Sequence, residues 1–265
     1  MAVDYHLEGH VAVITGSTSG IGQALAEALA GQGVNVVLNG FGDPEKIEAD
    51  RRRIQEKTNA RVLYHGADMT KPDEIVDLIA YAHSELGRLD ILVNNAGIQY
   101  VAPVDEYPEE KWDALIAVIL SSTFHATKAA IPLMKAQGRG RIVNIASAHG
   151  LVASAFKAPY CAAKFGVVGF TKSCAVELAR TGITVNAICP GYVKTPLIEA
   201  QVVDQAKTRG IPEDRVIEDV ILAAQPNKTF VEYAHLAGML LYLVSDLGAS
   251  ATGAALSVDG AWTAT

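Results

Sequence analysis

The sequence predicts an α/β protein built on a doubly wound, seven-stranded parallel sheet with helices on both faces. Short β-branched apolar runs alternate with segments of helical periodicity along the whole chain. A glycine-rich turn joins the first apolar run directly to the first helical segment. The chain has 265 residues, half of them hydrophobic, which is enough to form the core of one such sheet.

Each expected strand is a continuous apolar run without alternation, which is typical of parallel strands that helices cover on both sides. These runs lie at residues 10–15, 34–39, 61–65, 90–95, 141–146, 183–188 and 255–260. Helical periodicity fills the intervals at residues 20–32, 44–57, 72–86, 109–136, 159–180 and 232–245. Strands that alternate with helices in this way favour parallel crossover connections.

One segment, residues 191–230, interrupts this alternation. It has mixed polarity and contains Pro196, Pro212 and Pro226. A long excursion on an α/β scaffold often covers a ligand site, so we expect a helical substrate lid here. A peripheral helical insertion without a ligand role is the alternative. No linker-like stretch divides the chain, and residues 1–265 are therefore expected to form a single domain.

Composition excludes several classes of function. The formal net charge is −7, which gives no electrostatic footprint for nucleic acid. The three cysteines are scattered without metal-ligand spacing, and no metal site is expected. The first ten residues lack a secretion-signal pattern, and the apolar run at 236–244 is too short to span a bilayer. We expect a cytoplasmic protein with no membrane or nucleic-acid partner.

The loop after the first strand carries the clearest ligand signal. Glycines let a backbone turn tightly and approach a ligand, and the following helix offers unpaired N–H groups to an anion. A glycine cluster between the first strand and the first helix predicts a dinucleotide whose pyrophosphate lies on that helix end. The cluster consists of Gly16, Ser17, Thr18, Ser19, Gly20, Ile21 and Gly22.

This G-x-x-x-G-x-G spacing resembles that of the short-chain dehydrogenase/reductase family. Further motifs of that family follow in order: Asp68 in GADMT, the N-N-A-G sequence at 94–97, Y-x-x-x-K at 160–164, and CPGYVKTP at 189–196. The resemblance covers nearly the whole chain and implies a Rossmann domain that binds a nicotinamide cofactor. The cofactor contacts it implies outside the glycine loop are Asp68, Asn95, Ala96, Gly97, Tyr160, Lys164, Pro190, Val193 and Thr195.

Tyr160 and Lys164 are four residues apart, so on a helix they share a face about 40° wide. A phenol normally ionises near pH ~10, and a neighbouring ammonium lowers that pKa. Tyr160 can then exchange a proton with a substrate hydroxyl while hydride leaves the same carbon. Ser147, at the end of the fifth strand, can hydrogen-bond the reacting oxygen. The family resemblance assigns these catalytic roles to Ser147, Tyr160 and Lys164.

The end of the second strand favours NAD as the cofactor. A carboxylate there selects the free ribose of NAD, whereas Arg or Lys accepts the phosphate of NADP. The chain instead has Asn39-Gly40-Phe41-Gly42, and Ser19 stands where many NADP-preferring relatives have a basic residue. With no charge to pair with a phosphate, NAD is expected. Phe41 is expected to pack on adenine, with ordinary loop packing as the alternative.

The polar residues around Tyr160 resemble those of bacterial D-3-hydroxybutyrate dehydrogenases within that family. The resemblance implies that four side chains hold the substrate carboxylate, namely Gln99, His149, Lys157 and Gln201. It also implies that Trp262, near the C-terminus, closes the pocket. A desolvated carboxylate needs such partners, and Lys157 provides the positive charge. The residues therefore predict a small 3-hydroxy acid as substrate.

Four positions depart from that pattern. Ile119 stands where the family usually has an asparagine that helps seat a water in the proton relay, and isoleucine cannot hold a water. Ser121 and Ser122 are the nearest polar residues by sequence. Tyr192 replaces a tryptophan of the substrate wall but keeps an aromatic face. Phe165 replaces a histidine, and Ala261 replaces a glycine before Trp262.

The leading prediction is an NAD-dependent enzyme that interconverts D-3-hydroxybutyrate and acetoacetate. An oxidoreductase of the same fold acting on another hydroxy acid, a sugar or a neutral alcohol remains the alternative. A non-catalytic NAD-binding protein is a third possibility, raised only by Ile119. The resemblance also implies a homotetramer, which the apolar helices at 109–136 and 159–180 would allow.

Overall fold

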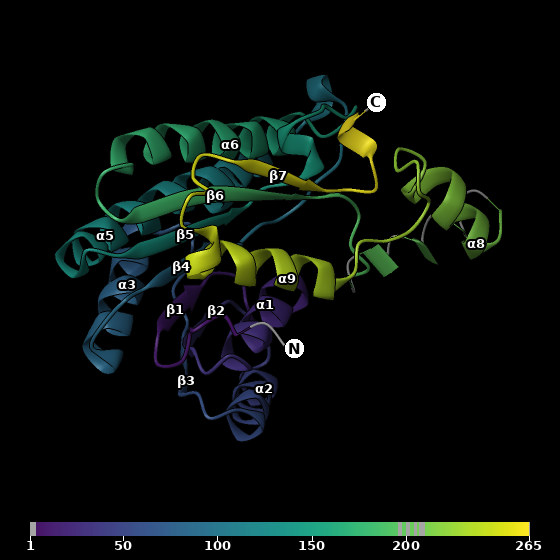
Figure 1. Ribbon diagram of the computed structural model, residues 1–265. Coiled ribbons are helices and arrows are strands. Elements are labelled where there is room, and N and C mark those ends of the chain that lie inside the picture. The colour runs from purple at the N-terminus through teal and green to yellow at the C-terminus, as the bar shows by residue number, and fades with distance from the viewer. Residues whose placement is uncertain (1–3, 196–197, 200–201, 204–205, 207–209, 265) are drawn as a thin grey trace.

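The computed structural model describes residues 4–195, 198–199, 202–203, 206 and 210–264. Seven parallel strands form one sheet with the order β3-β2-β1-β4-β5-β6-β7 (Figure 1). Their bounds are β1 Val11–Ile14, β2 Asn35–Asn39, β3 Val62–His65, β4 Ile91–Asn94, β5 Gly140–Ile145, β6 Ile183–Pro190 and β7 Ala255–Val258. Each expected strand forms, and the predicted fold class is confirmed.

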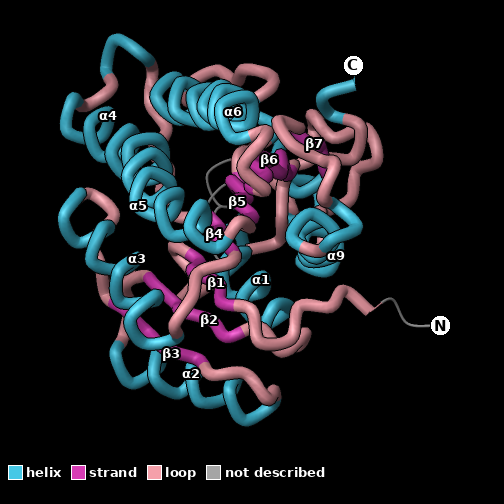
Figure 2. The backbone as a smooth tube through the Cα atoms, turned by 60° about the vertical axis from the view of Figure 1, so that its left-hand side comes forward, coloured by secondary structure: helices cyan, strands magenta, loops and turns pink. Residues whose placement is uncertain are grey.

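Helices cover both faces of the sheet, as Figure 2 shows. One face carries α1 (Gly20–Ala30), α2 (Pro44–Lys57) and α9 (Tyr233–Val244), and the other carries α3 (Pro72–Leu86), α5 (Ser122–Gln137) and α6 (Ala158–Leu178). In β1, Ala12 and Ile14 pack into the first core, while Val11 and Val13 pack into the second. Successive strand residues point to opposite faces, so an all-apolar strand is what a two-sided core requires.

The strand order reverses between β1 and β4. From β1 the chain builds outward through β2 and β3, and then it crosses back to place β4 on the other side of β1. The connections after β1 and after β4 therefore diverge at the carboxyl ends of these two strands. In an open α/β sheet such a divergence leaves a crevice that can hold a ligand.

The apolar segment expected as one helix at 109–136 is interrupted. The chain forms α4 (Glu109–Leu115), a π-helical turn η2 (Ile116–Ser121) and then α5. By length and composition, residues 109–137 are apolar enough to cross a membrane. However, α5 packs against α3, β4 and β5, which identifies it as a core helix of this fold. Side-chain periodicity alone did not reveal the extra residue that a π turn inserts.

The excursion at 191–230 is partly described. Figure 1 shows α8 (Glu213–Val216) standing away from the sheet, and the π-helical turn η4 (Ile217–Ile221) follows it directly. The two ends of the excursion meet in a parallel bridge between Val193 and Val231. Its described apolar residues form a small cluster of their own, which includes Val202, Val216, Ile221 and Leu222. The expected helical character is thus present in the described part.

Asp90 links three strands at their amino ends through its side chain and its backbone. Asp90 lies just before β4 and is 1% exposed. Its side chain accepts the N–H of Val11 at 2.9 Å and two N–H groups of Arg88 at 2.7 Å each. Its backbone carbonyl accepts the N–H of Arg141. The carboxylate therefore satisfies the buried Val11 N–H where β1 begins and pairs with the half-exposed Arg88.

Replacing Asp90 by alanine should lower the free energy of unfolding by about 1–3 kcal/mol, because the buried Val11 amide loses its acceptor while the half-exposed Arg88 can turn to water. Denaturant unfolding of the two proteins measures the difference. The matched control is Asp105→Ala, since Asp105 is exposed; this change should cost less than about 0.5 kcal/mol. Equal losses in the two variants would show that Asp90 contributes no special stabilisation.

Candidate active site

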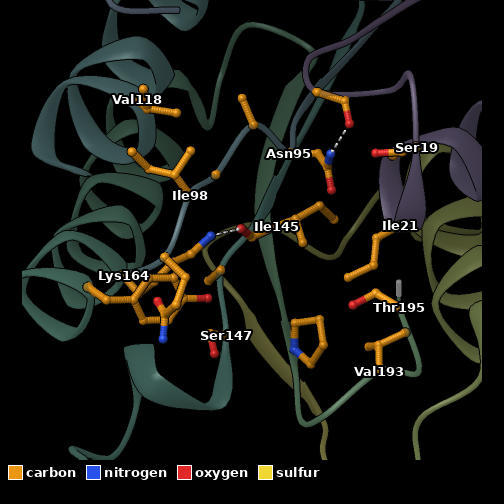
Figure 3. A pocket seen from close by; sticks show the side chains of 18 of the residues that line it. Ser19, Ile21, Asn95, Ile98, Val118, Ile145, Ser147, Lys164, Val193 and Thr195 are labelled. Atoms are coloured by element: carbon orange, nitrogen blue, oxygen red, sulfur yellow. Dashed lines mark hydrogen bonds between the residues drawn. The ribbon is translucent and has the colours of Figure 1, made fainter. Parts of the chain in front are cut away.

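A cavity of about 540 Å³ lies at the carboxyl ends of the strands (Figure 3). Ser19 and Ile21 face it from the glycine loop and the start of α1, and Lys164 and Ser147 face it from the opposite side. The cavity thus lies in the crevice that the strand order creates, and it is large enough for a dinucleotide and a small substrate.

The glycine loop forms one wall of this cavity. Gly16 and Gly20 have φ angles of 62° and 58°, a left-handed conformation that glycine adopts without strain. α1 begins at Gly20, and the Ser19 side chain does not cap it. A Cβ on Gly22 would lie 2.3 Å from the Gly16 carbonyl oxygen, so only glycine permits this packing. The free N–H groups of the first turn fit a pyrophosphate.

Two residues of the loop do not line the cavity, namely Ser17 and Gly20. Ser17 is fully buried, and its hydroxyl donates to the Ile14 carbonyl at 2.7 Å. The same oxygen accepts the N–H of Asn39 at 3.0 Å. The Ser17 side chain therefore joins the ends of β1 and β2, and it points into the protein instead of toward a ligand.

The loop after β4 is held against the glycine loop. The Thr15 hydroxyl accepts the N–H groups of both Asn95 and Ala96 at 3.0 Å. In return, the Asn95 amide donates to the Thr15 and Gly16 carbonyls, each at 2.9 Å. Asn95, Ala96 and Gly97 all line the cavity. These four hydrogen bonds fix the distance between the two walls.

At the far end of the cavity, the Asn39 side chain is fully used in hydrogen bonds within the protein, whereas the Asp68 carboxylate can accept hydrogen bonds from a ligand. The buried Asn39 amide donates to the carbonyls of His65 and Ala67, at 3.1 and 2.9 Å, so it has no free donor for a ligand. Hydrogen bonds from Thr70 to the Asp68 carboxylate lower the pKa of Asp68 below its usual value. Asp68 is therefore ionised at neutral pH and lines the cavity.

No basic side chain lines this end of the cavity within the described part of the chain. The residues that line it from the loops after β1, β2 and β3 are Gly16, Thr18, Ser19, Ile21, Gly22, Asn39, Gly40, Phe41, Ala67, Asp68, Met69 and Thr70. A Cβ on Gly40 would lie 2.5 Å from the Thr18 hydroxyl oxygen, and Phe41 is 66% exposed. A doubly negative phosphate would therefore meet no lysine or arginine among these lining residues.

Ser147, Tyr160 and Lys164 meet at the other end. Ser147 follows β5, and its hydroxyl hydrogen-bonds the Tyr160 hydroxyl. Pro159 stands in the first turn of α6, where its missing N–H costs nothing. Lys164 lies one turn after Tyr160; it is 4% exposed and donates to the Ile145 carbonyl at 2.7 Å. The Lys164 nitrogen is 5.7 Å from the centre of the Tyr160 ring.

Burial opposes the charged forms of both groups. It raises the pKa of Tyr160 to about 12, although the hydrogen bond from Ser147 lowers it in part. It also lowers the pKa of Lys164 to about 8. Lys164 thus stays cationic at neutral pH but gives up a proton more easily than an exposed lysine. Tyr160 needs additional positive charge beside it before it can act as a base near neutral pH.

A group of rings and polar side chains surrounds the space next to Tyr160. Trp262 stacks on Tyr192 with 5.4 Å between the ring centres and 9° between the planes. His149 is 4% exposed and meets the Trp262 ring edge-on at 4.9 Å. Lys157 donates to the Tyr192 hydroxyl at 3.3 Å. The sequence placed all four residues in one substrate pocket, and they line the same cavity.

Three buried polar atoms in this pocket lack a hydrogen-bond partner within the described part of the chain. They are the Gln99 side-chain oxygen and both ring nitrogens of His149, whose ring makes only a contact with the Val152 backbone that lacks normal hydrogen-bond geometry. Burial, together with the charge of Lys157, lowers the pKa of His149 to about 4. The imidazole is therefore neutral at physiological pH and offers one donor and one acceptor. Unpaired buried polar atoms that face a cavity indicate a place for a polar ligand.

The sequence predicts Gln201 as a further carboxylate ligand in this pocket and places Ile119 where the family usually has an asparagine. Gln201 lies outside the described residues. Ile119 is 1% exposed and packs in an apolar cluster with Leu115 and Val167, while its neighbour Val118 lines the cavity.

Neither Ser121 nor Ser122, the polar residues nearest to Ile119 in sequence, lines the cavity. The hydroxyl of Ser122 donates to the Val118 carbonyl of its own helix at 2.6 Å. It is therefore engaged within the helix instead of facing the cavity.

Sequence reasoning did not name several apolar lining residues, among them Met69, Ile98, Val118, Ile145 and Ala146. Met69, Ile98, Ile145 and Ala146 lie in or just after the carboxyl ends of strands, where any side chain can reach the crevice. Their position at or just after a strand end could have predicted that these four residues line the cavity. Val118 lies in the π-helical turn, which periodicity did not reveal.

Comparison with known proteins gives concordant matches. The family model described as short chain dehydrogenase matches residues 10–206. The chain is 55% identical over 253 residues to a D-beta-hydroxybutyrate dehydrogenase of Rhizobium meliloti, covering 96% of this chain and 98% of that protein. It is 50% identical over 258 residues to a protein of the same name from Cupriavidus necator, covering 97% and 99%.

Solved structures are also similar. A variant of actinorhodin polyketide ketoreductase with NADPH gives a TM-score of 0.90 at 34% identity, with both chains covered completely. L-sorbose reductase from Gluconobacter frateurii, in complex with NADPH and L-sorbose, gives a TM-score of 0.94 at 30% identity over 99% of this chain and 100% of that chain.

The buried His149 predicts a pH-dependent stability. Its pKa is about 4 when folded and about 6.5 when unfolded. Between these values the unfolded chain binds the proton and the folded chain does not, so stability falls as the pH falls from 6.5 to 4. By pH 5 the loss from this residue is about 2 kcal/mol. His149→Gln should therefore lose about 2 kcal/mol less than the unsubstituted protein between pH 7 and 5.

Denaturant unfolding of both proteins at pH 7, 6 and 5 measures this difference. The comparison at pH 7 sets the baseline, since His149 is neutral in both states there. Parallel pH profiles for the two proteins would mean that His149 is protonated in the folded protein as easily as in the unfolded one.

Proposed function

The chain belongs to the short-chain dehydrogenase family, and we propose that it interconverts D-3-hydroxybutyrate and acetoacetate with NAD as cofactor. The observation that carries this proposal is the composition of one cavity. Ser147, Tyr160 and Lys164 line it together with the cation Lys157. An acid/base group for an alcohol and a positive charge for a carboxylate thus lie within reach of one small hydroxy acid.

The proposed cofactor site runs along the cavity from the loops after β1 to β3 toward β6. The first turn of α1 holds the pyrophosphate, while Phe41 and Asp68 bind the adenosine end. Asn95, Ala96 and Gly97 form the floor, with Pro190, Val193 and Thr195 covering the nicotinamide end; all of these line the cavity. When bound, NAD supplies the hydride acceptor and a positive charge beside Tyr160.

The choice of NAD over NADP rests on this chain's own residues. The described residues that line the adenosine end include no lysine or arginine, and the Asp68 carboxylate is an acceptor only. The two solved relatives described above contain NADPH, so the choice for this chain rests on its own lining residues. The lack of a counter-charge beside Gly40 favours the free ribose here.

In oxidation, Tyr160 takes the proton of the substrate hydroxyl as hydride leaves the carbon. Ser147 hydrogen-bonds Tyr160 and can also hydrogen-bond the reacting oxygen of the substrate. It therefore holds the substrate oxygen close to the Tyr160 hydroxyl. Lys164 contributes one positive charge that favours the phenolate. In reduction the same groups act in reverse, and Tyr160 returns the proton to the carbonyl oxygen.

Lys157, His149 and Gln99 are proposed to bind the substrate carboxylate. Lys157 compensates its charge, while the neutral His149 and Gln99 offer polar atoms that lack partners in the described residues. Trp262 and Tyr192 form an apolar wall beside them. The segment 191–230 acts as the lid. Gln201, which lies outside the described residues, is proposed as the fourth carboxylate ligand because the sequence resembles 3-hydroxybutyrate dehydrogenases at this position.

Residues 1–265 are proposed to act as one NAD-binding catalytic domain within a cytoplasmic homotetramer. The described cysteines are free and buried, which fits a reducing compartment. Large apolar side chains remain exposed on α4, α5 and α6: Trp112, Phe124, Phe165 and Val176. Exposed apolar groups on neighbouring helices are what a subunit interface would cover.

A turnover assay with both enantiomers of 3-hydroxybutyrate and both cofactors tests the function. The absorbance of reduced nicotinamide should rise with the D-acid and NAD, and at least about tenfold more slowly with NADP, since no charge binds its phosphate. The L-acid should give no turnover, because its hydride would face away from the cofactor. Faster turnover of an uncharged alcohol than of the D-acid would exclude the proposal.

Tyr160→Phe tests the catalytic assignment. Removal of the hydroxyl eliminates the proton acceptor, so kcat should fall by about 10²–10⁴-fold. NAD affinity, measured by calorimetry, should change little because the ring remains. The control is Tyr81→Phe. Tyr81 lies on α3 and does not line the cavity, so this substitution should leave kcat unchanged. A Tyr160→Phe enzyme with normal kcat would contradict the role of this hydroxyl.

A further inference from the structure

Lys157 and Tyr192 form a pair at the substrate end of the cavity. The Lys157 ammonium donates to the Tyr192 hydroxyl at 3.3 Å and lies 5.5 Å from the centre of the Tyr192 ring. The two residues come from different parts of the fold, since Lys157 directly precedes α6 and Tyr192 follows β6. The contact therefore fixes a flexible lysine side chain against a group on the opposite wall.

The backbone of Tyr192 is firmly held. Its N–H donates to the side-chain oxygen of Gln225, and its carbonyl accepts the N–H of Val231 at 2.8 Å. Gln225 is fully buried, and its own amide donates to the Thr229 carbonyl at 2.7 Å. Residues from the far end of the 191–230 excursion thus position Tyr192.

The Tyr192 ring is also fixed in orientation. Trp262 stacks on it, His149 meets Trp262 edge-on, and His149 in turn lies edge-on to Tyr160 at 6.1 Å. Such offset and edge-to-face arrangements are the favoured geometries of aromatic pairs. A continuous row of rings therefore connects Tyr192 to the acid/base Tyr160, so the distance between their two hydroxyls is set by packing.

The Tyr192 hydroxyl has an unused donor. A phenol can donate one hydrogen bond and accept others, and here its oxygen accepts from Lys157. Within the described part of the chain no acceptor binds its proton. Tyr192 lines the cavity, so the proton is available to a ligand that brings an acceptor.

We propose that the Tyr192 hydroxyl is a further ligand of the substrate carboxylate, which it binds jointly with Lys157. The ammonium and the phenol would donate to the two oxygens of one carboxylate, while the hydroxyl holds the ammonium in place. This proposal rests on the proposed function and adds a residue that determines specificity. The pair selects a carboxylate over an ester or amide, because only the anion neutralises Lys157 and makes the stronger, charge-assisted hydrogen bonds to both donors.

The pairing depends on tyrosine at this position. Phenylalanine keeps the ring that stacks on Trp262 but has no hydroxyl. Tryptophan keeps an aromatic wall, yet the indole N–H is only a donor and cannot accept from Lys157. Tyr192→Phe and Tyr192→Trp therefore both remove the acceptor for the ammonium, and they differ in the area of the wall.

Binding of acetoacetate to the NAD-loaded protein, measured by calorimetry, tests the proposal without turnover, since neither molecule can donate hydride to the other. Tyr192→Phe should weaken acetoacetate binding about tenfold, as expected for loss of a hydrogen bond to a charged group. NAD affinity should not change. The control is Tyr107→Phe, because the Tyr107 hydroxyl donates to the Tyr100 carbonyl and does not line the cavity; it should leave acetoacetate affinity unchanged.

The double variant Lys157→Ala with Tyr192→Phe tests the joint action. If the two groups bind one carboxylate together, the loss of affinity should be smaller than the product of the two single losses. Tyr192→Trp should resemble Tyr192→Phe in affinity. Unchanged affinity in Tyr192→Phe, or losses that multiply fully, would overturn the proposal.

The outcomes separate this proposal from the proposed function. If the unsubstituted protein binds acetoacetate through Tyr192 but does not oxidise D-3-hydroxybutyrate, the carboxylate site stands and the substrate assignment fails. If the unsubstituted protein oxidises the D-acid but Tyr192→Phe keeps full affinity for acetoacetate, the proposed function stands and the role of the Tyr192 hydroxyl fails. Failure of the NAD-loaded protein to bind acetoacetate at all would overturn both.

Discussion

The contact between the loops after β1 and β4 is the constraint on which the site depends. Thr15 accepts two backbone N–H groups from the second loop, and Asn95 returns two hydrogen bonds to the first. A Cβ on Gly22 would lie 2.4 Å from the Asn95 amide nitrogen, so the two loops approach as closely as glycine allows. This approach fixes the width of the cavity where the strand order reverses.

The two halves of the sheet, on either side of this contact, line different ends of the cavity. The loops after β1, β2 and β3 line the end of the cavity without basic side chains. The ends of β5 and β6, together with the start of α6, line the other end, where the partly buried Tyr160 and the buried Lys164 lie. Burial that opposes charge on both residues makes the phenol sensitive to any further positive charge. A site that gains its base only when a cationic ligand arrives would avoid unproductive proton exchange.

Much of this could be predicted from sequence because the signals were local. Strand runs and helix periodicity are read from neighbouring residues, and the seven strands formed as expected. Ser17 illustrates the limit: its place in a glycine loop indicated a ligand contact, yet its hydroxyl pairs with β1 and β2. The π turn at 116–121 escaped detection for a similar reason, since one extra residue in a long apolar helix leaves the composition unchanged.

The arrangement of the rings could not be read from the sequence, because it arises from pairing at the edge of the sheet. β6 and β7 are parallel neighbours, with Pro190 opposite Val258. Tyr192 follows the first of these residues by two positions and Trp262 follows the second by four, so the register brings the two rings together although 70 residues separate them. The substrate wall is thus a consequence of strand register, and a change in the β6–β7 pairing would alter the wall before it altered the cofactor end. The hydroxyl of Tyr192 adds to this wall a polar group whose direction is fixed by the same register.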